Sequence, residues 1–544
     1  MDNIACALLE TVQKRPQRNA LIVPDGKGAR RWTFLEIEGQ VSLYAHALIR
    51  AGIKRGDRVV LMVRPSMEFT ALTFALFAIG AVVILIDPGM GYKNLLRCIG
   101  SVRPEVFIGI PAAQLFKKLF PGAFKTIRTS ICVGCSFGFL GKSLNSLISS
   151  PNGKSLNPIQ PDEEDLAAII FTTGSTGPPK GVQYTHKIFQ SQLKMIRNYY
   201  GIKPGDVDQP AFPLFALFAL CLGATAVIPV MDPTRPAKVN PKKFVRTICD
   251  YKVTYSFGSP AIWNVVSRYC KKEQIKLPSL KTVLMAGAPV PGDLVRRVKS
   301  IISDSGEVHI PYGATECLPI VSMTGSEILQ STWAKTKEGK GTCVGRALPG
   351  IRVEIIKASD ELIDFVDQSN ILPIDEIGEI IVQGSVVTKA YDNNDKENAY
   401  SKIKDTNGGF WHRIGDLGYR DREGRIWFCG RKAHRVRTTE GPMYSVCCEA
   451  VFNNHADVRR SALVGIGQKG SQTPIIIVEP NKKGIQPARL YSDLRKIALR
   501  YEHTRFIRHF MIHLSFPVDI RHNAKIFREK LAVWAEKQEM IKLS

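Results

Sequence analysis

Short apolar runs alternate with stretches of helical character along much of the chain, and this alternation constrains the fold more than any other feature. The runs are rich in Val, Ile and Leu and lack a polar face, which is typical of strands buried on both sides of a sheet. We expect such strands at residues 58–63, 81–86, 167–171, 253–257 and 282–286. Helices are expected between them, for example at residues 187–199 and 291–300. This order predicts an α/β fold with largely parallel sheets.

Two changes of pattern divide the chain. From residue 341 to residue 383, strand-like segments punctuated by Gly and Pro predict a smaller β-rich subdomain. Beyond Gly430 and Arg431, helix candidates at 444–454, 488–501 and 526–537 accompany strand-like runs at 462–464 and 474–478, which predicts a compact α+β domain. Because 544 residues exceed the usual size of one domain, we expect an N-terminal domain over residues 1–430 and a C-terminal domain over residues 431–544.

The chain carries a net charge of +25, from 74 basic and 49 acidic residues. Basic side chains attract nucleic acid, anionic lipid headgroups or anionic substrates. The excess is spread along the chain, and no RNA-binding or zinc-finger signature accompanies it. We therefore expect a generally basic surface, no nucleic-acid partner and at most a peripheral association with anionic membrane.

Twelve cysteines are scattered irregularly. Cys132 and Cys135 have CxxC spacing, but neither a second pair nor paired histidines complete a zinc site. Free thiols in a reducing compartment are the expected state. The first residues lack the basic-then-apolar order of a signal peptide, so the sequence predicts a cytoplasmic protein.

An uncharged stretch at residues 69–86 has the length of a membrane span. Gly80 divides it into an Ala/Leu/Phe half that suits a helix and a Val/Ile half that suits a strand. Asp87 and Pro88 then give a turn signal. We expect a buried helix followed by a strand, and no membrane span.

A loop rich in Gly, Ser and Thr directly follows the expected strand at 167–171. Glycines let backbone N–H groups approach phosphate oxygens, hydroxyls add donors, and a lysine supplies positive charge. The loop is not a GxxxxGK[ST] P-loop, because Pro179 occupies a glycine position of that motif. A flexible surface loop is the alternative, and phosphate binding fits the composition better. The candidate phosphate-binding residues are Thr172, Thr173, Gly174, Ser175, Thr176, Gly177 and Lys180.

This loop, TTGSTGPPKGV, closely resembles the phosphate-loop signature of the adenylate-forming superfamily, which includes acyl-CoA synthetases, luciferases and nonribosomal adenylation domains. Further motifs of that superfamily follow in its order: Gly287-Ala288-Pro289, Tyr312-Gly313-Ala314-Thr315-Glu316, Gly415-Asp416-Leu417-Gly418, Gly430-Arg431, and Asn523-Ala524-Lys525-Ile526 with Arg528. The match spans roughly residues 15 to 535. Any one motif arises by chance more readily than several in order.

The resemblance implies a role for each motif. Gly287, Ala288 and Pro289 pack on adenine, and Tyr312, Gly313 and Ala314 lie in a nucleotide-binding segment in which Thr315 contacts phosphate and Glu316 holds Mg²⁺. Asp416 grips the ribose hydroxyls, Arg431 reaches the nucleotide, and Lys525 is the catalytic lysine of a mobile C-terminal domain. ATP and Mg²⁺ are therefore the implied cofactors. The chemistry agrees, because a carboxylate attacking an α-phosphate needs positive charge to offset the two anions. His186 is expected to cap or orient the adjoining helix and not to act as a base.

The chain departs from many relatives in two places. In the segment that contacts the acyl group, Ala216 replaces the His of PxFHxxG, and Phe215, Ala216 and Phe218 are the candidate acyl-binding residues. At the interdomain hinge, Ala433 follows Gly430-Arg431-Lys432 where Asp or Lys is usual, and the next residues depart from the glycine-rich pattern of CoA ligases. These are the regions that form the second half-site in relatives, which argues against thioester formation with CoA.

The segments GRKAHRV, EGPMYS and VRRSALVGIG, together with residues 516–525, are similar to the β-lactone synthetases of bacterial long-chain olefin biosynthesis. That resemblance implies adenylation of a 2-alkyl-3-hydroxy fatty acid, whose 3-hydroxyl then closes a β-lactone and expels AMP. A long-chain hydroxy acid is the implied substrate, and other enzymes of the olefin pathway are implied partners. The alternatives are a long-chain fatty acyl-CoA synthetase and a non-catalytic nucleotide- or acyl-binding protein.

Overall fold

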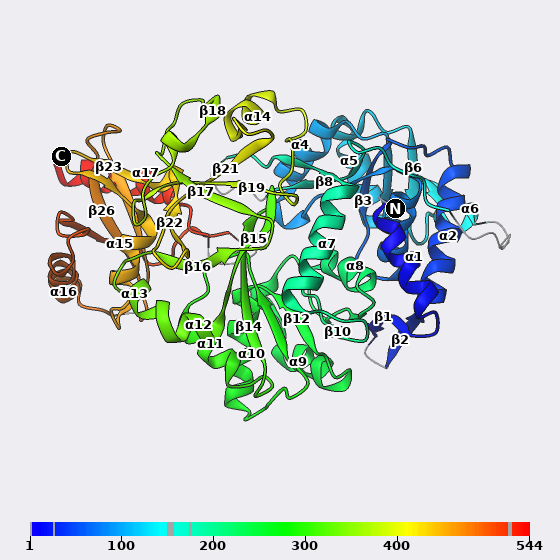
Figure 1. Cartoon of the computed structure of the whole chain (residues 1–544), viewed down its shortest axis with the longest axis horizontal. Coiled ribbons are helices and arrows are strands. Elements are labelled where there is room, and N and C mark those ends of the chain that lie inside the picture. Colours follow the sequence, from blue (N-terminus) through cyan, green and yellow to red (C-terminus); the bar gives the residue numbers. More distant parts are fainter. Residues whose placement is uncertain are drawn as a thin grey trace.

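The computed structural model describes residues 3–25, 28–148, 157–172, 177–482, 484–519 and 525–543. Within these residues the chain forms two large sheets flanked by helices and a smaller C-terminal α+β unit (Figure 1). The expected α/β class, with a large N-terminal part and a small C-terminal part, is confirmed.

The first large sheet carries the candidate phosphate loop at one end. Its strands are parallel except β9, which pairs antiparallel with β8. In sheet order they are β7 (Lys142–Ser143), β6 (Thr129–Cys132), β5 (Val106–Gly109), β3 (Arg58–Met62), β4 (Val82–Leu85), β8 (Leu166–Phe171) and β9 (Gly181–Thr185). Strands β3, β4 and β8 match three of the expected apolar runs.

The uncharged stretch at 69–86 forms a helix followed by a strand, as expected. Helix α3 (Met67–Ala78) begins where the Ser66 side chain accepts a hydrogen bond from the Phe69 N–H. It ends before Gly80, whose φ of +72° is strained for other residues, and β4 follows. In the part of the chain that the structure describes, no helix is long and apolar enough to cross a membrane.

The second large sheet is parallel in one half and mainly antiparallel in the other. The parallel half contains β14 (Glu307–Ala314), β13 (Thr282–Met285), β12 (Tyr255–Gly258), β10 (Val207–Asp208), β11 (Thr225–Val227) and β1 (Asn19–Pro24), with antiparallel β2 (Ala29–Thr33) at its edge. The other half contains β15 (Cys317–Thr324), β16 (Thr342–Ala347), β22 (Ile426–Arg431), β21 (Phe410–Arg420), β19 (Gly378–Gln383), β17 (Arg352–Ile356), β18 (Phe365–Val366) and β20 (Lys402–Asp405). The expected strands at 341–383 are present and belong to this mainly antiparallel half of the sheet.

Helices cover the sheets as the alternation predicts. The two expected at 187–199 and 291–300 are α7 (His186–Tyr200) and α11 (Gly292–Lys299). Others that matter below are α1 (Ile4–Lys14), α4 (Tyr92–Val102), α5 (Pro111–Leu119), α8 (Pro213–Cys221), α10 (Pro260–Lys272) and α14 (Asp395–Ser401).

The C-terminal unit has hydrophobic cores of its own. Strand β25 (Val458–Ile466) pairs antiparallel with β26 (Thr473–Pro480), which pairs parallel with β27 (His509–Ile512). Around them lie the hairpin of β23 (Val436–Thr438) and β24 (Gly441–Met443) and the helices α15 (Ser445–Phe452), α16 (Pro487–Arg500) and α17 (Arg528–Leu543). The buried clusters on the two faces of this sheet draw only on residues from Val436 onward. A boundary after residue 430 stays a prediction, and these separate cores support it.

All twelve cysteines are free thiols, including Cys132 and Cys135. Among the described residues no group of three or more His, Cys, Asp or Glu side chains is arranged to hold a metal ion.

Candidate active site

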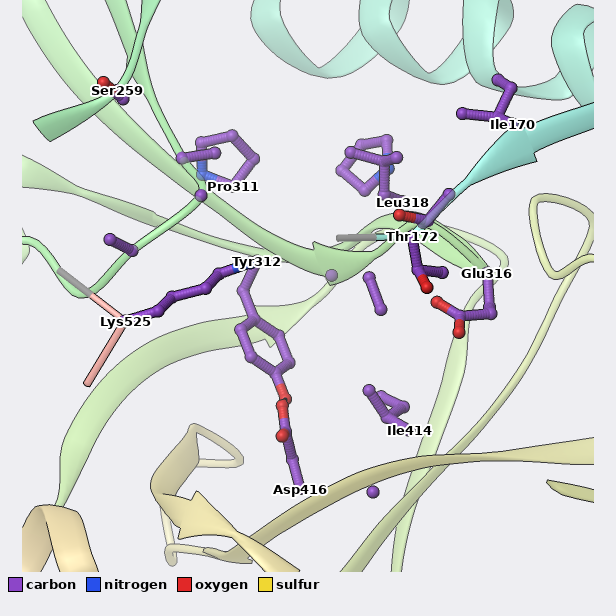
Figure 2. Close-up of a pocket in the computed structure, with 18 of the residues that line it drawn as sticks. Ile170, Thr172, Ser259, Pro311, Tyr312, Glu316, Leu318, Ile414, Asp416 and Lys525 are labelled. Carbon is purple, nitrogen blue, oxygen red and sulfur yellow. The ribbon is translucent and has the colours of Figure 1, made fainter. Parts of the chain in front are cut away.

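One cavity of about 960 Å³ gathers the predicted site residues from distant parts of the chain (Figure 2). It is lined by Thr172, Gly177, Lys180, Phe215, Phe218, Gly287, Ala288, Pro289, Tyr312, Gly313, Ala314, Thr315, Glu316, Asp416, Arg431 and Lys525. Thr173, Gly174, Ser175 and Thr176, which were also predicted, lie outside the described residues.

Ala216 is not among the residues that line the cavity. It is 2% exposed and belongs to the N-terminal hydrophobic core. The reason is helical geometry: on α8, Phe215 and Phe218 are three residues apart and share a face, whereas Ala216 is turned away from it. The expectation that Ala216 contacts the acyl group is therefore not supported by its position.

The candidate phosphate loop is closed at its base by two hydrogen bonds. The Thr172 N–H donates to the Lys180 carbonyl (3.0 Å), and the Lys180 N–H donates to Thr172 Oγ1 (3.1 Å). These bonds continue the β8–β9 pairing beyond Phe171 and Gly181. The Lys180 ammonium pairs with Glu397 and lies 5.1 Å from the centroid of the Tyr391 ring. Lys180 is thus held at the cavity wall by a carboxylate that an anionic ligand would compete with.

Thr315 and Glu316 form the turn of the hairpin between β14 and β15, because Ala314 pairs with Cys317. A side chain at Gly313 would place a Cβ 2.4 Å from the Cys317 carbonyl oxygen, so the tight turn requires glycine there. The Tyr184 hydroxyl donates to the Thr315 carbonyl and fixes the turn from the β9 side. Figure 2 shows Glu316 and Thr172 on one side of the cavity and Lys525 on the other.

Tyr391 positions the Glu316 carboxylate, and sequence reasoning missed it. Its hydroxyl donates to Glu316 Oε1 at 2.6 Å, although the two residues are 75 positions apart in the chain. The Lys402 ammonium donates to the Thr388 carbonyl and lies 5.9 Å from the Tyr391 ring centroid. Burial lowers the pKa of Lys402 to about 8. No local pattern around Tyr391 signals this contact, because the partner comes from another element.

We expect Tyr391→Phe to raise the Mg²⁺ concentration needed for half-maximal activity about tenfold, because Glu316 loses the hydrogen bond that orients it. The aromatic ring at position 391 and its contacts with Lys180 and Lys402 remain, so the melting temperature should stay close to that of the unmodified protein. Activity is measured against Mg²⁺ at saturating ATP. An unchanged Mg²⁺ dependence would mean that the hydroxyl has only a structural role.

Asp416 and Arg431 face each other on β21 and β22 as a cross-strand pair. An Arg431 nitrogen lies 3.0 Å from Asp416 Oδ1, and the Tyr312 hydroxyl donates to Oδ2 at 2.6 Å. Burial raises the pKa of Asp416, and the charge of Arg431 opposes that rise. Oδ1 is buried and, among the described residues, receives no hydrogen bond of acceptable geometry. Arg431 and Tyr312 thus hold the Asp416 carboxylate in one orientation beside the cavity.

Lys525 reaches the cavity from the C-terminal unit, and its side chain extends toward the backbone of Tyr312 (Figure 2). Its backbone N–H donates to Asp519 Oδ1 at 2.8 Å, and Ile526 forms a β-bridge with Val518. Three residues later, Arg528 pairs with Glu449 of α15 at 2.6 Å. The segment that carries the lysine is therefore anchored on both sides.

The linker after Arg431 is tied to the N-terminal part by buried charges that sequence reasoning also missed. The Lys432 ammonium donates to both oxygens of Glu379 (2.9 Å each) and to the Tyr400 hydroxyl (2.6 Å). Glu379 also pairs with Arg413 at 2.8 Å, and both side chains are almost fully buried. Beyond the linker, Arg435 and Arg437 pair with Asp360. These contacts hold the C-terminal unit in the orientation that places Lys525 in the cavity.

Part of the cavity wall is aromatic. Phe215 stacks on Phe257 with ring centroids 3.9 Å apart, and Phe189 contacts both Phe218 (6.1 Å) and Phe77 (5.8 Å). Cavities lined in this way bind apolar ligand groups, and the same cavity is also lined by Lys180, Arg431 and Lys525. One cavity therefore joins an anion-binding region to an apolar region.

His186 has an orienting role, as expected, although Thr185 provides the cap of α7. Its Nδ1 accepts a hydrogen bond from the Ile4 N–H at 3.2 Å and so links α7 to the start of α1. Burial lowers the pKa of His186 to about 4, which keeps the ring neutral at physiological pH.

The family model described as AMP-binding enzyme matches residues 8–392. The chain is 41% identical to an olefin beta-lactone synthetase of Xanthomonas campestris pv. campestris, over 99% of this chain and 98% of that protein. It is 42% identical to another protein of that name from Stenotrophomonas maltophilia, over 98% of both. A long-chain-fatty-acid–CoA ligase of Thermus thermophilus is 24% identical over 86% of this chain and 84% of its own.

Solved structures share the fold over nearly the whole chain. The amide bond synthetase McbA from Marinactinospora thermotolerans has a TM-score of 0.81 and 22% identity, with 98% of this chain and 99% of that chain covered. The O-succinylbenzoate coenzyme A synthetase MenE from Bacillus subtilis, in complex with AMP, has a TM-score of 0.76 and 21% identity, with 96% of this chain and 97% of that chain covered.

Proposed function

The chain belongs to the AMP-binding enzyme family, and on that premise we propose that it adenylates a long-chain 2-alkyl-3-hydroxy fatty acid with ATP and closes the product to a β-lactone. The observation that carries the proposal is the cavity that joins a basic region to an aromatic region. The name shared by two nearly full-length relatives at 41% and 42% identity supports the choice of product.

The basic region suits a nucleotide. Gly287, Ala288 and Pro289 would contact the adenine, and Asp416, which lines the same cavity, would receive a ribose hydroxyl. Lys180 would move from Glu397 to the phosphates, since a triphosphate carries more negative charge than one carboxylate. Arg431 lies beside the Asp416 carboxylate, where it would contact the nucleotide.

Glu316 suits a magnesium ion. Of the described acidic residues that line the cavity, Glu379, Glu397 and Asp416 each form an ion pair with a lysine or arginine. Glu316 instead accepts from the neutral Tyr391 hydroxyl. Mg²⁺ usually takes one or two carboxylates together with substrate phosphates, so one available carboxylate fits. The bound ion would neutralise phosphate charge during transfer.

In the first step the substrate carboxylate attacks the α-phosphorus of ATP, a carboxylate oxygen–phosphorus bond forms, and pyrophosphate leaves. Negative charge accumulates where two anions meet, and the Lys525 ammonium would stabilise it. In the second step the 3-hydroxyl oxygen attacks the activated carbonyl, the acyl–phosphate bond breaks, and AMP leaves while the hydroxyl loses its proton.

The second step needs no further acceptor, because the hydroxyl is part of the acyl group. An internal nucleophile already close to its target has a large effective concentration. The contacts of Lys432 with Glu379 and of Arg435 and Arg437 with Asp360 keep the C-terminal unit over the cavity. A reaction that takes place entirely within one cavity does not require these contacts to break.

We expect incubation with ATP, Mg²⁺ and a long-chain 2-alkyl-3-hydroxy acid to yield AMP, pyrophosphate and a product lighter than the acid by one water, without added CoA. Mass spectrometry of the product measures this directly. The matched control is the same acid without its 3-hydroxyl, which should be adenylated and then accumulate as acyl-AMP because no group can close the ring.

Added CoA distinguishes the competing assignment. Efficient release of the accumulated acyl-AMP as a thioester would favour a fatty acyl-CoA synthetase and contradict lactone formation. Absence of pyrophosphate–ATP exchange with either acid would contradict adenylation of this substrate class altogether.

A cytoplasmic location, domains meeting after residue 430, mobility of the C-terminal domain and association with other olefin-pathway enzymes are further parts of the proposal. The free state of all twelve cysteines supports the first of these.

A further inference from the structure

Five large hydrophobic side chains between residues 92 and 139 are strongly exposed to solvent. They are Tyr92, Leu115, Leu119, Phe137 and Phe139, with exposed fractions from 52% to 66%, and we call them the aromatic patch. Monomeric proteins seldom leave a contiguous apolar patch in water without a binding role.

Contacts between elements make the patch continuous. On α5, Leu115 and Leu119 are four residues apart and share a helix face. The Tyr92 ring at the start of α4 stacks on Phe120, just beyond α5, at 6.1 Å. The loop after β6 supplies Phe137 and Phe139, whose ring centroids are 6.4 Å apart.

A lysine joins the two parts of the patch, since the Lys118 ammonium lies 4.8 Å from the centroid of the Phe139 ring. The inner side of the same region is packed in the ordinary way, because Phe116 and Phe107 contact the buried Phe124. The exposed rings are therefore an outer layer on a formed core and are not a sign of incomplete folding.

The segment that carries the patch is strongly basic. Residues 92–142 contain eight lysines and arginines and a single acidic residue, Glu105. The Glu105 carboxylate accepts a hydrogen bond from the backbone N–H of Arg58, so it already has a partner within the protein. Six of the basic residues are exposed and form no ion pair with any described residue: Lys93, Arg97, Arg103, Lys118, Lys125 and Lys142.

We propose that this surface docks the protein on an anionic lipid bilayer, with the aromatic patch inserted at the headgroup level and the surrounding lysines on lipid phosphates. Aromatic rings and lysines with apolar stems are the side chains that suit this interface. Binding of this kind adds an apolar contribution to attraction by the negative surface potential. The inference goes beyond the proposed function and does not depend on it.

The position of the patch leaves the site clear. Helix α5 and strand β6 lie in the half of the molecule opposite the C-terminal unit, and α4 lies nearer the middle (Figure 1). None of the five patch residues lines the cavity. The net charge of +25 is larger than a binding site for one nucleotide requires. The basic residues of the docking surface account for part of it.

The test is flotation of the full-length protein with vesicles of phosphatidylcholine alone or with about one third phosphatidylglycerol, a fraction typical of strongly anionic membranes. We expect binding only to the anionic vesicles, and weaker binding in high salt because exposed charges are screened. Lys118→Glu with Lys125→Glu should lower the partition coefficient at least tenfold. Each lysine near the surface is attracted by the anionic lipid, and each glutamate is repelled by it. Leu119→Ser with Phe137→Ser and Phe139→Ser should abolish the binding that survives in high salt.

Matched controls carry the same changes elsewhere. Lys271→Glu with Lys272→Glu replaces exposed lysines at the end of α10, and Leu362→Ser with Leu514→Ser replaces exposed leucines. Both controls should bind like the unmodified protein, and all variants should keep its melting temperature and its ATP-dependent activity on a detergent-dispersed acid. Equal binding to neutral and anionic vesicles, or unaltered binding by the patch variants, would overturn the proposal. A dimer that the patch variants dissociate, seen by light scattering, would overturn it too and assign the patch to a second copy.

Discussion

Lys525→Ala is expected to lower pyrophosphate–ATP exchange about 10²- to 10³-fold, the usual cost of removing one preorganised group that stabilises transition-state charge. Lys525 comes from the C-terminal unit and is the residue that we assign to the reacting groups. Figure 2 shows its side chain extending into the cavity. Loss of its charge would leave the carboxylate and the α-phosphate to approach each other unshielded.

The fold should survive this substitution. Lys525 is partly exposed, and alanine retains the backbone N–H that donates to Asp519 Oδ1. Exposed substitutions of this kind change the free energy of unfolding by about 0.5 kcal/mol or less. Lys537→Ala, at an exposed position on α17, is the matched control and should keep full exchange activity. If the rate of pyrophosphate–ATP exchange in Lys525→Ala were within a few-fold of that in Lys537→Ala, the assignment of Lys525 as the catalytic lysine would be refuted.

Glu316→Gln should raise the Mg²⁺ concentration for half-maximal activity by at least about a hundredfold, because losing a ligand should cost no less than losing a partner that only orients a ligand. The amide has the size of the carboxylate but no charge for the ion, so binding of the metal weakens while the hairpin turn is kept. Tyr391 can still donate to the amide oxygen, which separates loss of charge from loss of the hydrogen bond. Activity is titrated against Mg²⁺ at fixed ATP.

Glu376→Gln, at an exposed turn, is the control for a carboxylate lost far from the cavity. If Glu316→Gln kept the Mg²⁺ dependence of this control, Glu316 would be a structural residue and the metal would bind through other groups. A stronger effect for Glu316→Gln than for Tyr391→Phe is expected, because the tyrosine acts only through the carboxylate.

Signals confined to a short stretch of chain were sufficient to predict much of this protein. The strand before the candidate phosphate loop, the division of residues 69–86 at Gly80 and the α+β character beyond Arg431 all follow from local patterns. The nucleotide-facing residues were also predictable, because each motif brings its chemistry in consecutive residues and the resemblance gives their order. All of those that the structure describes line one cavity, including Lys525.

Side-chain direction on a helix required the structure. The acyl-binding prediction treated Phe215, Ala216 and Phe218 alike, yet the helix turns Ala216 into the core while the two phenylalanines face the cavity. The angular position of α8 relative to the sheet decides this, and packing of the whole domain sets that angle.

The sequence by itself determined the class of fold and the order of its elements, and it predicts which residues carry the nucleotide chemistry, because these features depend on composition and spacing within short segments. Only the tertiary structure decided the partners: Tyr391 with Glu316 across 75 residues, Lys432 with Glu379 across 53, and the aromatic patch assembled from α4, α5 and the loop after β6. Contacts of this kind arise from chain folding that brings distant segments together, and a single sequence contains no periodic signal for them.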